Sequence, residues 1–340
     1  MYTMAMHNQD SKMFISPRAL SSTYPNEQVM IYTLLILTAF FWGGTFIAGK
    51  LLAGQVPPVS SSFLRFFIAT IALSMILFVN RTLPPLPPRQ YWLKLLLLGF
   101  TGVFSYNILF FTGLEQISAG RAALIIATTP LIITVTSSLL YKEKLTLAAG
   151  AGIFVSLTGA LFVISNGDLS LLFSGGFGQG ELAITGCVLS WTAYTIFGRS
   201  VLTGMSPLSS VLYSSIAGSA MLLIPALFEG LPGLLIEINY KSWLALAYLG
   251  IFGTALGFTW YYRAITTIGA SRAGIFINMV PVFGVLLSWL ILAETFKPSV
   301  ITGGLLVLGG VMLANSPGWK KKQSVPKNKD SSVHSQNRND

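Results

Sequence analysis

The segment Arg121–Glu143, RAALIIATTPLIITVTSSLLYKE, returns 151 positions later as Arg272–Glu294, RAGIFINMVPVFGVLLSWLILAE. Both segments begin with Arg-Ala, carry a proline nine positions further on and end with a glutamate. The correspondence extends over Gly99–Ser165 and Gly250–Ser316, where glycines also recur at equivalent positions. Charged residues and prolines are rare in apolar sequence, so their agreement in order indicates an internal repeat.

The composition is that of a membrane protein. Of 340 residues, 53% are apolar and only 9% are charged, too few to cover a water-facing surface. A hydrocarbon core about 30 Å thick needs about 20 apolar residues per helix, and continuous runs of that length favour helices over barrel strands. We therefore predict an all-α integral membrane protein with ten transmembrane helices. The ten runs are 30–49, 59–79, 94–114, 121–140, 147–165, 181–199, 208–228, 242–263, 272–292 and 299–315.

The repeat also covers the first two helices of each half, at an offset of 149, so that Trp42 corresponds to Trp191 and Pro58 to Pro207. Each half then has five helices, and because five is odd, the second half must enter the membrane in the opposite sense. Such inverted repeats are common in alternating-access transporters, which hold substrate near the midplane between the halves. The predicted organisation is a polar tail at 1–29, a first repeat at 30–165, a linker at 166–180, a second repeat at 181–316 and a basic disordered tail at 317–340.

Lysine and arginine are distributed unevenly between the two sides of this bundle. Sixteen of the 21 fall on the side that holds both termini, and four on the other. The positive-inside rule therefore places both termini in the cytoplasm of a multi-pass plasma (inner) membrane protein. The net charge of +10 is partly carried by the tail after the last helix, which indicates a lipid bilayer and not nucleic acid as partner. Residues 1–28 hold no apolar core of signal-peptide type, and several early methionines leave the start codon open.

One nucleotide-binding motif is excluded by its context. Gly44–Lys50 has the spacing of a phosphate-binding loop, but Leu51 replaces the Ser/Thr that would hold Mg²⁺, and the motif ends a membrane helix. Transport would therefore run on a gradient or be passive. The two histidines, His7 and His334, lie in the tails, and Glu181 is the only other carboxylate near the membrane interior. The pattern predicts no metal, no cofactor and no enzyme.

Polar and aromatic side chains inside the runs are the candidates for substrate contact, because each needs a partner in hydrocarbon. Trp42 and Trp191 are equivalent by the repeat and indicate the walls of a cavity. The amides of Asn107 and Asn278 can both donate to and accept from a substrate, although a helix–helix hydrogen bond explains them equally well. The predicted substrate-binding residues are Trp42, Asn107, Trp191, Tyr194, Trp260 and Asn278; Tyr106, Thr128, Thr129 and Tyr261 are further polar residues inside the runs.

A single charge lies deep inside a run. Arg65 is seven residues past Pro58, roughly 10 Å from the outer end at about 1.5 Å per residue. It either meets an anionic group of the substrate, or snorkels outward, or binds a carbonyl of a neighbouring helix. The second repeat has Ser214 at this position.

Charged residues at the ends of the repeated segments suggest gates. Inversion places Glu143 with Arg272 on the inner face and Glu294 with Arg121 on the outer face, so that these pairs could act as alternating latches. The alternative is that each glutamate caps the N-terminus of the next helix. Prolines inside the same two runs predict kinks. The gating and structural residues are Arg65, Arg121, Pro130, Glu143, Arg272, Pro281 and Glu294.

Three features together resemble the EamA-type family of the drug/metabolite transporter superfamily. They are Trp42-Gly43-Gly44, Leu64-Arg65-Phe66 and the twice-repeated Arg-Ala…Pro…Glu…Gly…Gly pattern. The resemblance covers about 30–316 and implies ten helices, two EamA domains and gradient-driven or facilitated movement of small metabolites. Members of the family export amino acids, and others handle sugars or drugs. Thr192-Ala193 departs from Gly43-Gly44 in the second copy.

The sequence thus predicts an alternating-access transporter, an exporter of a small metabolite such as an amino acid, not driven by ATP. An aromatic pocket with few charges suits a zwitterionic or neutral, partly apolar solute. A passive channel or facilitator for small solutes, and an exporter of sugars, nucleosides or drugs, are the alternatives. Substrate, direction, coupling ion and oligomeric state are left open.

Overall fold

The computed structural model describes residues 25–141, 147–165, 167–168, 178–202, 204–268 and 270–314, and within these the regular structure is helical throughout. Six of its helical segments are long and apolar enough to cross a membrane: 28–52, 58–79, 89–116, 119–140, 207–228 and 240–268. Shorter apolar helices cover 150–163, 280–292 and 298–313. The all-helical class is confirmed for the described residues, whereas six candidate spans stand where ten were predicted.

The first half contains α1 (Pro25–Leu52), α2 (Pro58–Val79), the 3₁₀ turn η1 (Arg89–Tyr91), α3 (Trp92–Leu98), the π-helix η2 (Gly99–Ser105), α4 (Tyr106–Gln116), α5 (Ala119–Ile126), α6 (Thr129–Tyr141) and α7 (Leu147–Ile164). The second half contains α8 (Gln179–Val201), α9 (Pro207–Phe228), α10 (Leu231–Glu237), α11 (Tyr240–Ala247), the π-helix η4 (Tyr248–Leu256), α12 (Gly257–Ile268), α13 (Ala270–Ile277), α14 (Val280–Leu292) and α15 (Pro298–Ala314). Four predicted spans are not among the six: 147–165, 272–292 and 299–315, where the described apolar helices are shorter, and 181–199, which lies in α8.

The two internal prolines break their helices, as predicted. The break falls between Ile126 and Thr129, just before Pro130, and between Ile277 and Val280, just before Pro281. Proline has no backbone N–H to donate, and its ring collides with the carbonyl four residues earlier. Each break therefore lies in the middle of an apolar run and frees backbone carbonyls there.

The two π-helices occupy equivalent positions in the repeat, and the sequence did not predict them. Residues 99–105 of η2 correspond to 250–256 of η4 at the offset of 151. α3, η2 and α4 follow one another without a gap, as do α11, η4 and α12. A π-helical turn alters the hydrogen-bond register inside a helix and is often found at functional sites.

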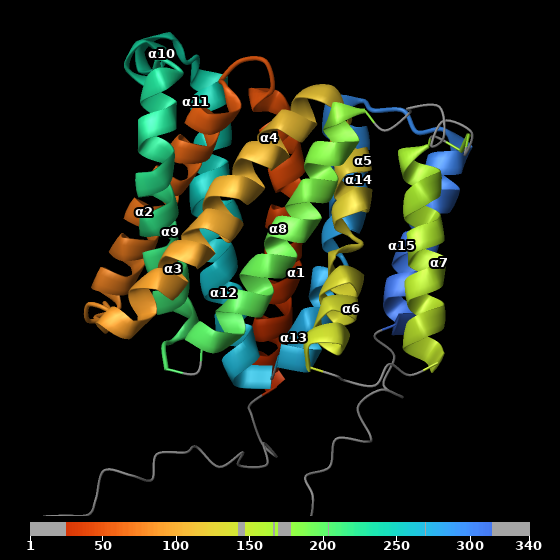
Figure 1. Ribbon diagram of the computed structural model, residues 1–340, viewed down its shortest axis with the longest axis horizontal. Helices are drawn as coiled ribbons and strands as arrows, with labels where there is room; N and C mark the ends of the chain where they lie inside the picture. The colour runs from red at the N-terminus through yellow and green to blue at the C-terminus, as the bar shows by residue number, and fades with distance from the viewer. Residues whose placement is uncertain are drawn as a thin grey trace, which may run out of the picture.

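The two halves interleave instead of forming separate bundles (Figure 1). η2 packs on α9 and η4 on α2, while α1 packs on α12 and α14, α4 on α8, and α7 on α15. Glycines permit the close approaches: a Cβ on Gly99 would lie 2.8 Å from the backbone nitrogen of Gly218, and one on Gly250 would lie 2.9 Å from the carbonyl of Arg65. The core is therefore built between the repeats.

The Trp42-Gly43-Gly44 motif has a direct packing role. A Cβ on Gly43 would lie 2.9 Å from the backbone of Gly284 in α14, and one on Gly44 would overlap the hydroxyl of Tyr248 in η4. That hydroxyl donates a hydrogen bond to the carbonyl of Phe41 at 3.0 Å. The two glycines thus allow α1 to contact two elements of the second half.

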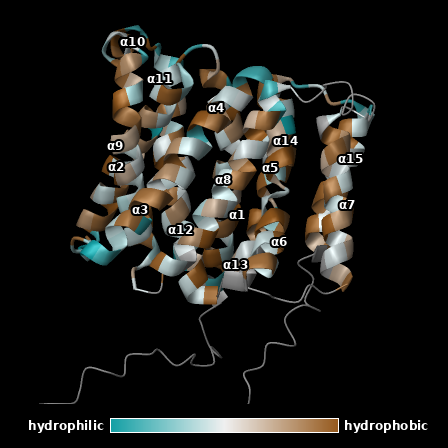
Figure 2. Ribbon diagram, in the orientation of Figure 1, coloured by the Kyte–Doolittle hydropathy of each residue, from teal (hydrophilic) through white to brown (hydrophobic). Residues whose placement is uncertain are grey.

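Figure 1 also shows the direction of the chain. α1 rises and α8 descends, and the first described residue of α1 and the last of α15 lie at the same end. We call that end the lower face, and the opposite end, where α1 ends and α5 begins, the upper face. Figure 2 shows hydrophobic residues along the flanks and hydrophilic ones at the two ends. Exposed side chains such as Phe154 and Met75 fit lipid better than water.

Candidate functional site

Aromatic side chains of both halves meet between α1, α4, α8 and α12. The ring of Trp42 lies 5.5 Å from Phe258 and 5.4 Å from Tyr261. The ring of Trp191 lies 5.4 Å from Tyr106, 5.1 Å from Tyr194 and 6.4 Å from Phe258. Phe258 therefore bridges the two tryptophans. We define the aromatic cluster as Trp42, Tyr106, Trp191, Tyr194, Phe258, Tyr261 and Tyr262.

The two π-helices border this cluster. The indole Nε1 of Trp42 donates a hydrogen bond to the carbonyl of Gly253 in η4 at 3.0 Å. In the other half, the ring of Tyr194 packs so closely on Gly102 of η2 that a Cβ there would overlap it. Gly102 and Gly253 are equivalent by the repeat. Each half thus presents a π-helical glycine to an aromatic residue of the opposite half.

Asn107 is held by the protein itself. Its amide Nδ2 donates to the carbonyls of Val103 at 2.9 Å and Gly102 at 3.4 Å, both in η2. Its Oδ1 accepts a hydrogen bond from Nη1 of Arg65 in α2, also at 2.9 Å. Arg65 and Asn107 are 8% and 1% exposed. This geometry matches the helix–helix alternative for Asn107, with Arg65 as the partner.

Two other predicted residues do not join the aromatic cluster. The ring of Trp260 lies 5.7 Å from Phe41, which in turn contacts Tyr248 and Phe252. Asn278 lies at the break between α13 and α14. The hydroxyls of Thr128 and Thr129 are used within their own chain segment, donating to the carbonyls of Ile125 and Ile126.

Phe258 and Tyr262 are members of the cluster that sequence reasoning missed. They are one helical turn apart in α12, and their rings stack at 6.2 Å. A phenylalanine in an apolar run looks like ordinary lipid-facing or core sequence, and its position at the first turn after η4 became evident only from the structure.

The upper face is held together by charged side chains that bind helix ends. Nζ of Lys50, at the end of α1, donates to the carbonyls of Leu114 at 2.6 Å and Ile117 at 3.0 Å, at the end of α4. The carboxylate of Glu294 accepts from the backbone N–H groups of Ala119 at 2.7 Å and Gly120 at 3.0 Å, at the start of α5. Both contacts match charge to the helix dipole.

Two further contacts of this kind join the halves at the upper face. The carboxylate of Glu229, after α9, accepts from the backbone N–H of Ser60 at 2.7 Å and its hydroxyl at 2.8 Å, in the first turn of α2. Nη1 of Arg121 lies 2.7 Å from Oε1 of Glu181, and its Nε donates to the carbonyl of Val163 at 3.1 Å. We call Lys50, Arg121, Glu181, Glu229 and Glu294 the cap network.

The cap network differs in detail from the predicted latch. Arg121 has the carboxylate of Glu181 as an ion-pair partner, while Glu294 binds the backbone two residues before Arg121. Glu294 also caps α5 of the other half and not the next helix along the chain. Glu143 and the side chain of Arg272 lie outside the described residues.

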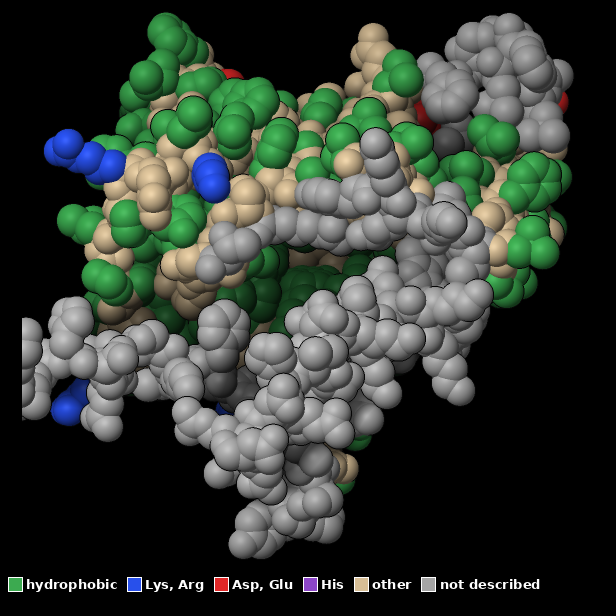
Figure 3. Space-filling view, turned by 60° about the horizontal axis from the view of Figure 1, so that its bottom comes forward, with side chains coloured by type: hydrophobic (Ala, Val, Ile, Leu, Met, Phe, Trp, Pro, Cys, Tyr) green, Lys and Arg blue, Asp and Glu red, His purple; other side chains and the backbone are tan. Residues whose placement is uncertain are grey.

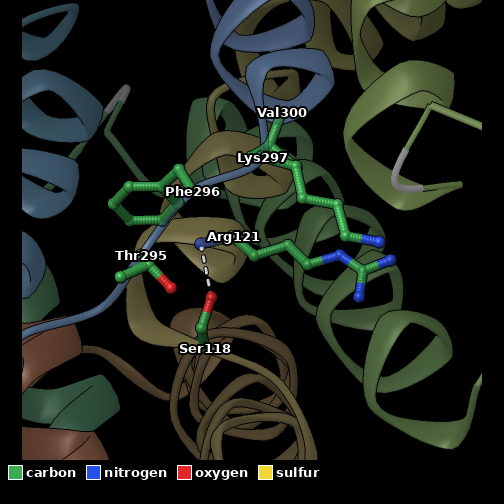
Figure 4. A pocket seen from close by; sticks show the side chains of 6 residues that line it. All are labelled: Ser118, Arg121, Thr295, Phe296, Lys297 and Val300. Carbon is green, nitrogen blue, oxygen red and sulfur yellow. Dashed lines mark hydrogen bonds between the residues drawn. The ribbon is translucent and has the colours of Figure 1, made fainter.

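A cavity of about 310 Å³ opens at the upper face between the start of α5 and the connection from α14 to α15 (Figure 4). In Figure 4 the side chains of Arg121 and Lys297 extend side by side along it. Its lining is Ser118, Arg121, Thr295, Phe296, Lys297 and Val300. Of the predicted residues it contains Arg121 but none of the substrate-binding set, so it is distinct from the aromatic cluster.

The lower face has a different form. Figure 3 shows it hollowed at its centre over hydrophobic side chains. Among the described residues no three His, Cys, Asp or Glu side chains come together as metal ligands would.

Comparisons with known proteins agree with this architecture. A model of the EamA-like transporter family matches residues 29–165 and 178–316. The uncharacterized transporter YyaM of Bacillus subtilis (strain 168) is 30% identical over 289 residues, 85% of this chain and 94% of that protein. A probable terminal-alkyne amino-acid exporter of Streptantibioticus cattleyicolor is 25% identical over 301 residues, 86% of this chain and 96% of that protein. A solved crystal structure superposes with a TM-score of 0.60 at 20% identity, over 84% of this chain and 97% of that one, which shows a shared fold.

Proposed function

Because the chain belongs to the EamA-like transporter family, we propose that this membrane transporter exports a small metabolite, such as an amino acid, by alternating access and without ATP. The protein is a multi-pass membrane protein of apolar helices. Its proposed setting is the plasma membrane, with ten spans in two inverted repeats at 30–165 and 181–316 and both termini in the cytoplasm. The opposite courses of α1 and α8 support the inversion (Figure 1).

The observation that carries the proposal is the position of the aromatic cluster between the halves. Trp42 comes from the first half and binds η4 of the second, while Tyr194 comes from the second half and packs on η2 of the first. A relative movement of the halves would therefore change the shape of this region directly. Above it, the cap network joins helix ends of both halves, and below it the lower face is hollowed. This arrangement suits a transporter closed at the upper face.

The substrate-contacting residues we propose are drawn from the aromatic cluster. Trp42, Trp191 and Tyr194 keep that role, joined by Phe258, Tyr261 and Tyr262. Aromatic faces bind apolar side chains and also attract ammonium groups. They therefore suit a zwitterionic solute with an apolar body. The amino-acid exporter among the relatives, at 25% identity, supports an amino acid as the first compound to test.

The test is counterflow in proteoliposomes that contain the purified full chain. Vesicles are loaded with one unlabelled amino acid, sugar or nucleoside, and uptake of the same labelled compound from a dilute outside solution is followed. A transporter produces a transient accumulation above equilibrium that depends on the internal compound. We expect this overshoot for at least one apolar amino acid, and Trp191→Ala should remove it. Equilibration without an overshoot for every compound would identify a passive channel and overturn the proposal.

A further inference from the structure

Arg65 is a cation buried in the middle of the bundle. The residue belongs to α2, a helix that contacts both π-helices, and it is 8% exposed. Nη1 donates to Oδ1 of Asn107, and Nε has no hydrogen-bond partner in the part of the chain that the structure describes. The guanidinium carbon also lies 5.4 Å from the ring centre of Phe66. None of these neighbours carries a negative charge.

A buried cation without a carboxylate is costly, and more so in a membrane. Glu181, Glu229 and Glu294 are used at the upper face, in the cap network, and the hydrogen bond described for Arg65 goes to the neutral amide of Asn107. Asn107, which accepts the hydrogen bond from Arg65, directly follows Tyr106 in α4. The arrangement therefore holds one uncompensated positive charge beside an aromatic residue that also contacts Trp191.

Resting on the function proposed above, we propose that Arg65 is a carboxylate-binding subsite for the substrate, with Asn107 as its positioning residue. A carboxylate binds a guanidinium best through two parallel hydrogen bonds, one of which comes from Nε or a terminal nitrogen. Asn107 occupies Nη1, while the buried Nε has no hydrogen-bond partner among the described residues, so we assign the edge that carries Nε to the ligand. The ligand class is an organic acid or zwitterion with one carboxylate and an apolar body.

The orientation of Asn107 follows from the π-helix. Its Nδ2 is fixed by the carbonyls of Gly102 and Val103, so that Oδ1 must face Arg65. Asn107 thus turns the guanidinium without cancelling its charge. An aspartate at this position would be nearly isosteric, but its own carboxylate would neutralise Arg65. A neutral amide instead leaves the positive charge of Arg65 for the carboxylate of a ligand.

The aromatic cluster provides a place for the rest of such a ligand. Tyr106 lies next to Asn107 in α4, and its ring leads through Trp191 to Tyr194 and Phe258. A carboxylate at Arg65 would leave the ammonium group and the apolar side chain of an amino acid to these faces. The equivalent position in the second half is Ser214, so only one orientation of the ligand is favoured.

The experiment compares acids with their amides in the counterflow assay. Wild-type vesicles are tested with labelled L-leucine and L-phenylalanine, and L-leucinamide and L-phenylalaninamide are added outside as competitors. We expect each acid to give an overshoot and each amide to compete at least about tenfold more weakly than the unlabelled acid, as the loss of a charge-assisted hydrogen bond implies. This comparison needs no variant and therefore does not depend on a mutant that folds.

Variants then locate the effect. Asn107→Asp and Arg65→Gln should each reduce the overshoot at least about tenfold, the first because an internal carboxylate competes for Arg65. Arg65→Lys keeps the charge and should retain part of the overshoot. Arg89→Gln removes an exposed arginine of η1 and should leave the overshoot unchanged. Size-exclusion profiles of the purified variants identify any that misfold.

The outcomes separate this inference from the proposed function. If an amide competes as well as its acid, or if Asn107→Asp transports the acids normally, the protein is a transporter and the carboxylate subsite is wrong. An overshoot with labelled uridine or glucose alone, unaffected by Arg65→Gln, leads to the same conclusion. If no compound gives an overshoot in wild-type vesicles, the proposed function itself fails and the subsite fails with it.

Discussion

The indole nitrogen of Trp42 donates a hydrogen bond to the carbonyl of Gly253, 3.0 Å away in space and 211 positions later in the chain. The acceptor belongs to η4, where the altered register of a π-helix frees carbonyls from the usual pattern. The equivalent residues of the other half are Trp191 and Gly102, but there the ring of Tyr194 packs on the glycine. The two halves therefore have different contacts at matching positions, as expected if they exchange conformations during transport.

Replacing Trp42 with phenylalanine should test the importance of this bond. Trp42→Phe keeps an aromatic ring but leaves the carbonyl of Gly253 without its donor. We expect the free energy of unfolding to fall by about 1–3 kcal/mol, with a larger loss of transport than of expression. Trp191→Phe is the matched control, because the contacts described for Trp191 are ring contacts. Thermal unfolding in detergent measures the stability of the two variants, and counterflow measures their transport. Equal destabilisation by Trp42→Phe and Trp191→Phe would contradict the assignment.

Glycine in η2 should be required by the ring of Tyr194. Gly102→Ala places a Cβ inside that ring, so Tyr194 or the π-helix must move. Overpacking of this kind costs about 1–3 kcal/mol, and transport should be lost even where the protein folds. Gly309→Ala in α15 is the control, since a Cβ there meets no atom within 4 Å. The idea fails if Gly102→Ala retains wild-type stability and counterflow.

The cap network should keep the upper face closed. Glu294→Gln keeps the shape of the side chain but removes the charge that stabilises the start of α5, a loss of about 0.3–2 kcal/mol. The upper face should then open more often. To measure this, Cys187 is replaced by serine and a new cysteine is introduced as Thr45→Cys, at a buried position one turn above Trp42. The rate at which a membrane-impermeant maleimide labels the new cysteine reports the opening of the upper face.

Labelling of this cysteine should rise several-fold on Glu294→Gln. Glu237→Gln, which changes an exposed carboxylate of α10, should have no effect. An unchanged rate for Glu294→Gln would mean that this cap does not control access.

The ion pair between Arg121 and Glu181 should contribute to stability as a unit. The two side chains are 16% and 7% exposed, and Glu181→Gln takes the partner of this ion pair away from the mostly buried guanidinium of Arg121. Glu181→Gln should therefore destabilise the protein by about 3 kcal/mol. The double variant Arg121→Met/Glu181→Gln should be more stable than the two single losses imply.

Lys297→Gln serves as the control. Lys297 is the other cation, beside Arg121, that lines the cavity at the upper face, and its replacement should change stability little. Strict additivity of the Arg121 and Glu181 variants in a thermal unfolding series would show that the pair has no energetic coupling.

The sequence revealed the parts of the fold that obey local rules. The repeat, the apolar runs and the breaks before Pro130 and Pro281 follow from composition and from the chemistry of proline. Trp42 and Trp191 were found because the repeat made them equivalent. These signals do not depend on which helix packs against which.

The rest depended on contacts between distant segments. The π-helices arise where η2 and η4 pack on α9 and α2, and no residue within them marks the change of register. For Asn107 the sequence left substrate contact and a helix–helix hydrogen bond open, because its partner Arg65 lies 42 positions away in another helix. Glu294 and Glu229 cap helices 175 and 169 positions away, a partnership that sequence spacing does not reveal.

The central claim is that the two halves alternate in opening the upper and the lower face. Distances between pairs of spin labels on the purified chain test it most directly. One pair is placed at the upper face, at Gln55 after α1 and Lys297 before α15, and the other at the lower face, at Arg81 after α2 and Arg263 in the last turns of α12; all four side chains are exposed. Addition of an amino acid that shows counterflow should lengthen the upper distance and shorten the lower one. Two distances that stay fixed, or that change in the same direction, would contradict the account.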